Sequence, residues 1–391
     1  MPASDFSALE YGQRLEKTRA RMAAQGVETL IVADPSNMAW LTGYDGWSFY
    51  VPQVVILHKH GAPLWWGRTQ DKAGAAQTTW LEDENLFDWP EEHVQHPDHH
   101  PFDALVTLLR DRGWTARLGV EMDNYYYSAA SHRILETAFG RDTIADATGL
   151  VNWCRAIKST AEVSMMQKAG QITARMHQVL RDTYREGLPK HELVAKVQAA
   201  GVEGVPGIAG DYPAIAPIAP SGREASASHI TWNDRPLIRG EATYFEVSGC
   251  FRRYHCPASR TLFLGDVPAD IRRAEDAVLQ AIEDTFAAAK PGTTCENVAA
   301  CVYDSFARAG YVKGNRTGYP IGLSYPPDWG ERTMSLRPGD TTKLEENMTF
   351  HLMPGLWTPD WGVAITESFV VTSEGGQALA DIPRPIVVKN D

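Results

Sequence analysis

Two spacings of apolar residues alternate along the first 150 positions or so of the chain. Residues 11–24 place Leu15, Thr18 and Met22 on one side and basic residues on the other, which predicts an amphipathic helix. A second helix is expected over residues 102–110. Short apolar runs bounded by turn residues predict buried strands at 29–33, 54–57, 63–66 and 117–121. Strands that alternate with helices indicate an α/β domain, which we expect to occupy residues 1–152.

The second half of the chain contains a faint internal repeat. Two predicted helices, 161–186 and 192–200, are separated by a glycine, and a similar pair, 269–290 and 296–309, follows about 105 residues later. Each pair precedes a set of predicted strands, which include 243–248, 349–353 and 366–372. This plan predicts a second domain, residues 153–391, with two pseudo-symmetric halves and a site between them.

Composition and charge narrow the classes of partner and compartment. The 391 residues carry a formal net charge of −12, which argues against a nucleic-acid surface because that would need a basic stripe. The five cysteines have no motif spacing, so we expect free thiols in a reducing compartment. The first residues lack the pattern of a charged segment followed by an apolar run, so we expect no signal peptide, and we expect no membrane span because no apolar run is long enough. We therefore expect a cytoplasmic protein that binds neither membranes nor nucleic acids.

Five segments carry a resemblance to a known superfamily. They occur in order along nearly the whole chain, at 37–44, 155–162, 229–241, 318–323 and 353–357. Together they resemble the pita-bread superfamily of creatinase, prolidase, aminopeptidase P and methionine aminopeptidase. The resemblance implies an α/β (α+β) fold: a creatinase-like N-terminal α/β domain followed by a pseudo-symmetric pita-bread domain. Residues 37–44 would then form a strand–loop entry in the first domain.

The resemblance also locates the positions at which metallopeptidases of this superfamily hold two metal ions. Here those positions are Glu246, Pro257, Tyr319, Met353 and Thr366. Proline and methionine cannot hold a hard divalent cation, which needs oxygen or imidazole ligands. We therefore expect neither a metal nor any other cofactor, and the substitutions argue against peptidase chemistry.

Three residues are candidates for catalysis. His229 stands seventeen residues before Glu246, the offset of the superfamily's proton-shuttling histidine, although a loop histidine bonded to backbone is the alternative. Glu246 lies in an apolar strand, where a carboxylate needs a compensating cation unless it faces solvent at an edge. With the metal lost, the substrate could supply that cation. Glu367 is one residue from the last ligand position, and strand alternation turns it to the opposite face unless a bulge intervenes.

Aromatic residues form a second group of candidates, because tryptophan and tyrosine faces can surround a small cation. The substrate-binding candidates are Trp47, Phe49, Tyr50, Tyr319, Trp357 and Trp361, with Trp329 nearby in the chain. Ordinary core packing is the alternative for each of them. The resemblance to creatinase implies a homodimer in which Trp47 and Phe49 cover the partner's site.

The segments 41–51 and 318–331 resemble the ectoine hydrolase branch of the superfamily. That branch implies a small cationic or zwitterionic substrate, ectoine or possibly hydroxyectoine, whose cyclic amidine is opened to an N-acetyl-2,4-diaminobutyrate. Water or Glu246 would attack, His229 would move protons, and Arg260 or Arg253 would pair with the ring carboxylate. The creatinase carboxylate position is Ser259 here, so the carboxylate has moved to Glu246. A divergent Xaa-Pro peptidase with a rebuilt metal site and a non-catalytic binding module remain alternatives.

Overall fold

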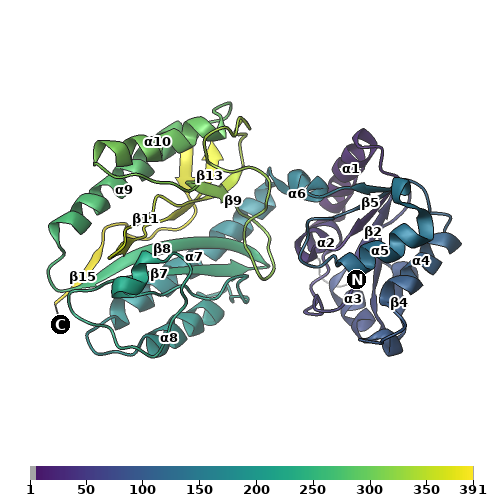
Figure 1. The fold of residues 1–391 in the computed structure, drawn as a ribbon, viewed down its shortest axis with the longest axis horizontal. Coiled ribbons are helices and arrows are strands. Elements are labelled where there is room, and N and C mark those ends of the chain that lie inside the picture. The colour runs from purple at the N-terminus through teal and green to yellow at the C-terminus, as the bar shows by residue number, and fades with distance from the viewer. Residues whose placement is uncertain (1–5, 391) are drawn as a thin grey trace. The chain divides into compact units, whose positions relative to one another are not determined.

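The computed structural model describes residues 6–390, which divide into two compact units with the boundary between Arg155 and Ala156 (Figure 1). The division falls three residues after the expected boundary because helix α6 (Leu150–Arg155) continues to Arg155. Each unit has its own sheets and its own core, and they are described separately.

A mixed six-stranded sheet forms the centre of the N-terminal unit, with strand order β4-β3-β2-β1-β5-β6. Its strands are β1 (Thr29–Val32), β2 (Val54–His58), β3 (Leu64–Arg68), β4 (Leu86–Trp89), β5 (Leu118–Val120) and β6 (Ile144–Asp146). The helices besides α6 are α1 (Ala8–Ala24), α2 (Pro35–Thr42), α3 (Lys72–Thr78), α4 (Pro101–Asp111) and α5 (Ala129–Phe139). The expected helices and strands of this α/β domain are present.

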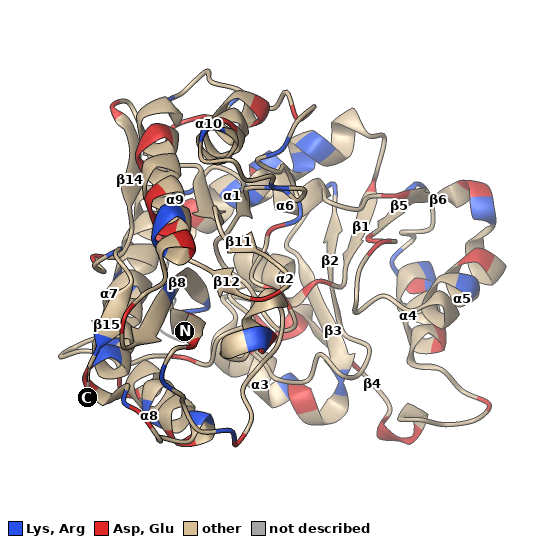
Figure 2. Cartoon of the chain, turned by 60° about the vertical axis from the view of Figure 1, so that its left-hand side comes forward, with Lys and Arg blue, Asp and Glu red and all other residues tan. Residues whose placement is uncertain are grey.

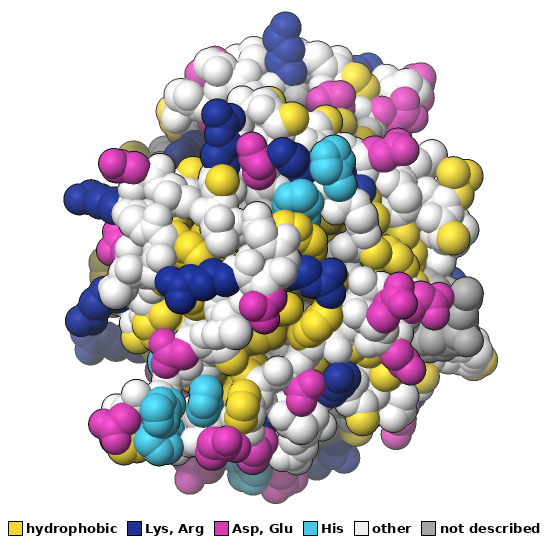
Figure 3. Space-filling view, turned by 90° about the vertical axis from the view of Figure 1, so that its right-hand side faces the viewer, with side chains coloured by type: hydrophobic (Ala, Val, Ile, Leu, Met, Phe, Trp, Pro, Cys, Tyr) yellow, Lys and Arg dark blue, Asp and Glu magenta, His cyan; other side chains and the backbone are white. Residues whose placement is uncertain are grey.

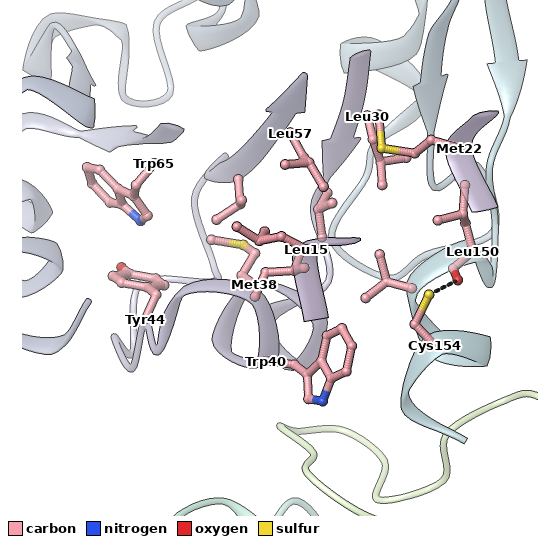
Figure 4. Close-up of a cluster of buried hydrophobic side chains, with 14 of the residues drawn as sticks. Leu15, Met22, Leu30, Met38, Trp40, Tyr44, Leu57, Trp65, Leu150 and Cys154 are labelled. Atoms are coloured by element: carbon pink, nitrogen blue, oxygen red, sulfur yellow. Dashed lines mark hydrogen bonds between the residues drawn. The ribbon is translucent and has the colours of Figure 1, made fainter. Parts of the chain in front are cut away.

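Both faces of this sheet are buried. Alternate residues of β1 point to opposite faces, so Leu30 joins one apolar cluster and Ile31 joins another. Figure 4 shows the first cluster, to which α1 contributes Met22, near Leu30, and Leu15, near Met38. The helical spacing at 11–24 therefore identified the buried side of α1 correctly.

The segment 37–44 corrects the sequence interpretation, because it begins inside helix α2 and not in a strand. The Asp34 carboxylate accepts hydrogen bonds from the backbone N–H groups of Ser36 and Asn37, and Pro35 occupies the first turn. Gly43 ends the helix with a φ of 80°, in the left-handed region that favours glycine. The Asp-Pro pair therefore starts a helix as well as ending β1.

The C-terminal unit has the two-fold plan that the repeat predicts. Its first helix pair is α7 (Thr160–Thr183) and α8 (Lys190–Glu203), and its second is α9 (Ala269–Ala288) and α10 (Cys295–Arg308). The strands after the first pair are β7 (Ala242–Phe251) and β8 (Tyr254–Leu264). Those after the second pair are β9 (Gly318–Pro320), β10 (Thr349–Leu352), β11 (Leu356–Trp357), β12 (Gly362–Val363), β13 (Glu367–Thr372), β14 (Gly375–Ala378) and β15 (Val387–Lys389). The fold is thus the expected mixed α/β pita-bread arrangement.

A long hairpin and a four-stranded sheet meet at the centre of this unit. In the antiparallel β7–β8 hairpin, Glu246 lies opposite Ser259. In the sheet β14-β13-β10-β9, His351 lies opposite Tyr319. Ser259 joins the two, because its backbone N–H donates to Thr366 Oγ1 at 2.7 Å and its carbonyl accepts from Thr366 N at 3.1 Å. Residues from both halves of the repeat are thereby brought together.

Charged residues of both signs are distributed over the helices, as α9 illustrates (Figure 2). The face drawn in Figure 3 likewise intermixes acidic and basic side chains without a broad basic patch. Within residues 6–390, no helix combines the length and the apolar composition needed to cross a membrane.

Candidate active site

Glu246 lies in the middle of β7 and is half-buried. Ser259 Oγ donates to its Oε2 at 2.7 Å, while Oε1 has no hydrogen-bond partner among residues 6–390. Burial raises the pKa of the carboxyl group, and the bond from Ser259 opposes that shift. Glu246 therefore has one oxygen fixed by the protein and one oxygen able to accept from a cationic ligand.

Four side chains form a buried chain of hydrogen bonds beside this carboxylate. Trp329 Nε1 donates to Tyr319 Oη at 2.7 Å, and that hydroxyl lies 3.1 Å from His351 Nδ1. His351 Nε2 lies 2.7 Å from Thr366 Oγ1. Burial lowers the pKa of His351 to about 3, so its ring is neutral near pH 7 and carries one proton between two hydroxyl groups. This chain fixes Tyr319 and Thr366 in place.

Tyr319 is also electrostatically linked to Glu246. Burial raises the pKa of the Tyr319 hydroxyl well above its usual range, and the nearby Glu246 charge raises it further. Tyr319 is therefore a neutral group beside the carboxylate, and the structure brings these two sequence candidates together.

The donor set does not fit the metal pair that the superfamily implies. Glu246 is the single carboxylate at the five aligned positions, and the hydroxyl groups of Tyr319 and Thr366 already bond to neighbouring side chains or backbone. The other two positions are Pro257 and Met353, which offer no hard ligand. No cluster of three or more His, Cys, Asp or Glu residues suited to a metal occurs between residues 6 and 390.

Arg260 and Glu367, two of the candidate site residues, bond to each other away from Glu246. They form a buried ion pair at 2.6 Å, and Arg384 approaches Glu367 at 3.2 Å. The remaining hydrogen bonds of the Arg260 guanidinium go to four backbone carbonyls, those of Ser259, Thr366, Ile382 and Pro383. Its five N–H donors are thus all used within the protein, which leaves none for a substrate carboxylate. Glu367 likewise has a structural partner.

Arg253, the other candidate for that carboxylate, lies at the turn between β7 and β8, where its φ is 64°. Its guanidinium stands 3.6 Å from the ring centre of Tyr212 and 5.7 Å from that of Tyr325. This stacking gives the side chain a role in holding the turn.

His229 is exposed, on the loop that precedes β7. The loop is fastened to the strand, because Tyr244 Oη donates to the Ala227 carbonyl at 2.8 Å and Tyr244 lies two residues before Glu246. Ser228 Oγ lies 3.4 Å from His229 Nδ1, and within the described chain no hydrogen bond joins the ring to Glu246. A role for His229 therefore stays a prediction.

The aromatic candidates occupy different surroundings. Trp47 and Tyr50, on a loop of the N-terminal unit, are 57% and 71% exposed, and Phe49 packs 4.9 Å from the Trp47 ring. Trp357 Nε1 donates to Tyr244 Oη at 3.4 Å, which places this indole next to the strand of Glu246. Trp361 Nε1 instead donates to Asp270 at the start of α9, and its ring meets Tyr311 edge-on. Trp357 is thus joined to the Glu246 strand by a hydrogen bond.

The sequence analysis did not identify two residues that lie near the site. His351 could have been found, because it lies two residues before Met353 along the same run, and strand alternation puts such residues on one face. Lys313 gave no signal, since it lies in a loop without periodicity between α10 and β9. Its ammonium is buried, donates to the Gly355 carbonyl at 2.9 Å and stands 5.1 Å from the centre of the Trp357 ring.

Comparison with solved structures shows the fold. A prolidase from Thermococcus sibiricus superposes with a TM-score of 0.84 at 18% identity and covers 98% of this chain and 100% of that chain. The dipeptidase PepE from Mycobacterium ulcerans gives a TM-score of 0.80 at 23% identity and covers 98% and 99%. At such identities the likeness concerns the architecture alone.

Sequence comparison shows the family. An ectoine hydrolase from Halomonas elongata is 50% identical over 98% of both chains. A hydrolase/peptidase from Sinorhizobium fredii is 39% identical over 98% of this chain and 99% of its own. The profile of the creatinase/prolidase N-terminal domain matches residues 14–157, and that of metallopeptidase family M24 matches residues 164–373. The chain is therefore a hydrolase that belongs to family M24 of the pita-bread superfamily and carries the N-terminal domain of creatinase and prolidase.

Proposed function

We propose that this hydrolase opens the cyclic amidine ring of ectoine, without a metal ion, to give an N-acetyl-2,4-diaminobutyrate. The observation that carries the proposal is the Glu246 carboxylate, which has an open oxygen where the superfamily's metal ligands have been replaced. The 50% identity to an ectoine hydrolase over nearly the full length supports this choice of substrate.

Substrate binding would depend on the opposite charges of the substrate amidinium and the Glu246 carboxylate. An amidinium carries its positive charge over two nitrogens and pairs well with a carboxylate through charge-assisted hydrogen bonds. Burial disfavours the ionised form of Glu246 in the free enzyme, so a bound cation offsets that cost and favours the carboxylate. The substrate thus provides the positive charge that a metal provides in other family members.

Two routes lead from this complex to the product. In one, Glu246 Oε1 bonds to the amidine carbon, and water later attacks the resulting imidoyl ester, which releases the N-acetyl product and the free carboxylate. In the other, Glu246 takes a proton from a water molecule that attacks the same carbon. In both, one water is consumed, the bond from that carbon to one ring nitrogen breaks, and that nitrogen gains a proton. We propose His229 as the group that moves this proton.

The test is incubation of the purified protein with ectoine, with product mass measured before and after treatment with a chelator. We expect a product heavier by one water, chelator-resistant activity and no stoichiometric metal by elemental analysis. Activity that is lost to the chelator and restored by Mn²⁺ or Zn²⁺ would contradict the metal-free route. Cleavage of Xaa-Pro dipeptides with no action on ectoine would favour the peptidase alternative.

We further propose that the protein acts as a cytoplasmic homodimer in which Trp47, Phe49 and Tyr50 of one subunit contribute to substrate binding in the other. The exposure of Trp47 and Tyr50 supports a surface role for this loop. Light scattering should give the mass of a dimer. Trp47→Ala should raise KM for ectoine if the loop covers a site, whereas an unchanged KM would remove it from binding.

A further inference from the structure

Lys313 is a buried lysine whose contacts lead to the strand of Glu246. The side chain is 9% exposed, although lysine is almost never buried without a partner. Nζ has one hydrogen-bond acceptor within residues 6–390, the carbonyl of Gly355. An ammonium has three N–H donors, so two remain available.

No carboxylate of the described chain pairs with Lys313 within 4.0 Å. Burial alone lowers its pKa, to about 7, and no neighbouring charge raises it. A buried ammonium without an opposite charge is unfavourable, so burial favours the neutral amine of Lys313 in the free protein. An anionic ligand would relieve that cost.

A short series of contacts connects Lys313 with Glu246. The ammonium stands 5.1 Å from the ring centre of Trp357, whose indole N–H donates to Tyr244 Oη at 3.4 Å. Tyr244 and Glu246 are two residues apart on β7, so their side chains share a face. A basic and an acidic side chain therefore flank the Tyr244–Trp357 pair.

We propose that Lys313 binds the carboxylate of the substrate while Glu246 binds its amidinium group, so that the site selects zwitterionic amidines. This inference rests on the proposed function. It replaces Arg260, whose donors are all used, as the partner of the ring carboxylate. Trp357 then acts as the apolar floor between the two charged groups.

The experiment compares ectoine with the same ring lacking the carboxylate, 2-methyl-1,4,5,6-tetrahydropyrimidine, as a competitor of ectoine turnover. In Lys313→Met we expect KM for ectoine to rise by about 10- to 100-fold. The Ki of the competitor that lacks the carboxylate should change less than about threefold. Lys313→Gln, which keeps a donor for Gly355, should behave alike. Lys196→Met, on the exposed side of α8, is the matched control and should leave both constants unchanged.

The decisive result is the difference between the change in KM for ectoine and the change in Ki for the competitor, because a purely structural role of Lys313 would change both constants alike. Parallel losses, or an unchanged KM for ectoine, in a folded Lys313→Met or Lys313→Gln protein would overturn the role of Lys313 alone. A wild-type protein that neither binds nor opens ectoine would overturn the proposed function and this inference together.

Discussion

Glu246 presents one oxygen to Ser259 and the other to its surroundings, so two roles can be separated in one variant. Glu246→Gln keeps the shape but loses the charge-assisted pair, which is worth about 1.5–3 kcal/mol. We expect ectoine to bind about one to two decades more weakly, measured by calorimetry. If Glu246 is the nucleophile, turnover should vanish at saturating substrate, because an amide cannot replace the carboxylate.

The matched control for that experiment is Glu203→Gln, at the exposed end of α8. Weaker binding with residual turnover would assign Glu246 to electrostatic pairing only. Wild-type affinity and rate in Glu246→Gln would show that this side chain does not meet the substrate.

The catalytic role of His229 needs a direct test, because the side chain is exposed and its hydrogen bond to the neighbouring Ser228 is long. His229→Ala should lower kcat by roughly 10²–10⁴-fold if the ring moves a proton in the reaction, with little change in stability. His191→Ala on α8 is the control, since that histidine is also exposed. Full activity in His229→Ala would remove the residue from the mechanism.

At the scale of elements, Arg260 ties β8 to the residues around the start of β13 and to the 382–383 segment. Arg260→Met leaves the buried Glu367 carboxylate short of its closest cation, and we expect a loss of about 3–5 kcal/mol in the free energy of unfolding. Urea denaturation measures this loss. KM for ectoine in the folded fraction should not change, because the N–H donors of Arg260 all bond within the protein.

The double variant Arg260→Met/Glu367→Leu should recover part of the lost stability, because no unpaired charge then remains. Arg308→Met, in a surface pair with Asp284, should cost about 1 kcal/mol or less. A stable Arg260→Met protein with a raised KM would instead restore the original assignment of Arg260 to substrate binding.

Elements with strong periodicity were predicted well, while those fixed by local caps or by tertiary contacts were not. The helical repeats at α1 and α7–α10 follow from residues at regular spacing in the sequence. Helix α2 was missed because its eight residues are all buried and show no amphipathic pattern, so only the Asp34 cap and Gly43 mark it. The carboxylate at Glu246 could be predicted, but the burial of Lys313 could not, since it depends on packing against Trp357 from a distant segment.

At the scale of the whole molecule, three buried histidines make stability depend on pH. Burial lowers the pKa values of His177, His255 and His351 to about 3 each. In the unfolded chain these groups titrate near 6.5, so the unfolded state binds more protons between those pH values. The stability that they contribute is present above pH 6.5 and is lost as pH falls toward 3.

Denaturant unfolding at a series of pH values should therefore show a proton uptake that approaches three from these histidines between about pH 5 and about pH 4. Carboxylates with lowered pKa values in the folded state add to it. His255→Asn should reduce the uptake by about one proton, whereas His191→Asn at the surface should not. Identical pH slopes in His255→Asn and the wild type would show that this ring is not neutral in the folded protein.

The hydrogen bonds around Thr366 bear on how such a site could arise or revert during evolution. Aspartate in place of Pro257 would add one metal ligand. The hydroxyl groups of Tyr319 and Thr366 would still form their hydrogen bonds with Trp329, His351 and Ser259. Each single substitution that introduces a metal ligand would therefore be surrounded by side chains that fit the present arrangement. Its effect would depend on whether the other ligand positions had also been changed. A stepwise mutational path back to a metallopeptidase should pass through inactive intermediates, which would keep the two chemistries apart within one fold.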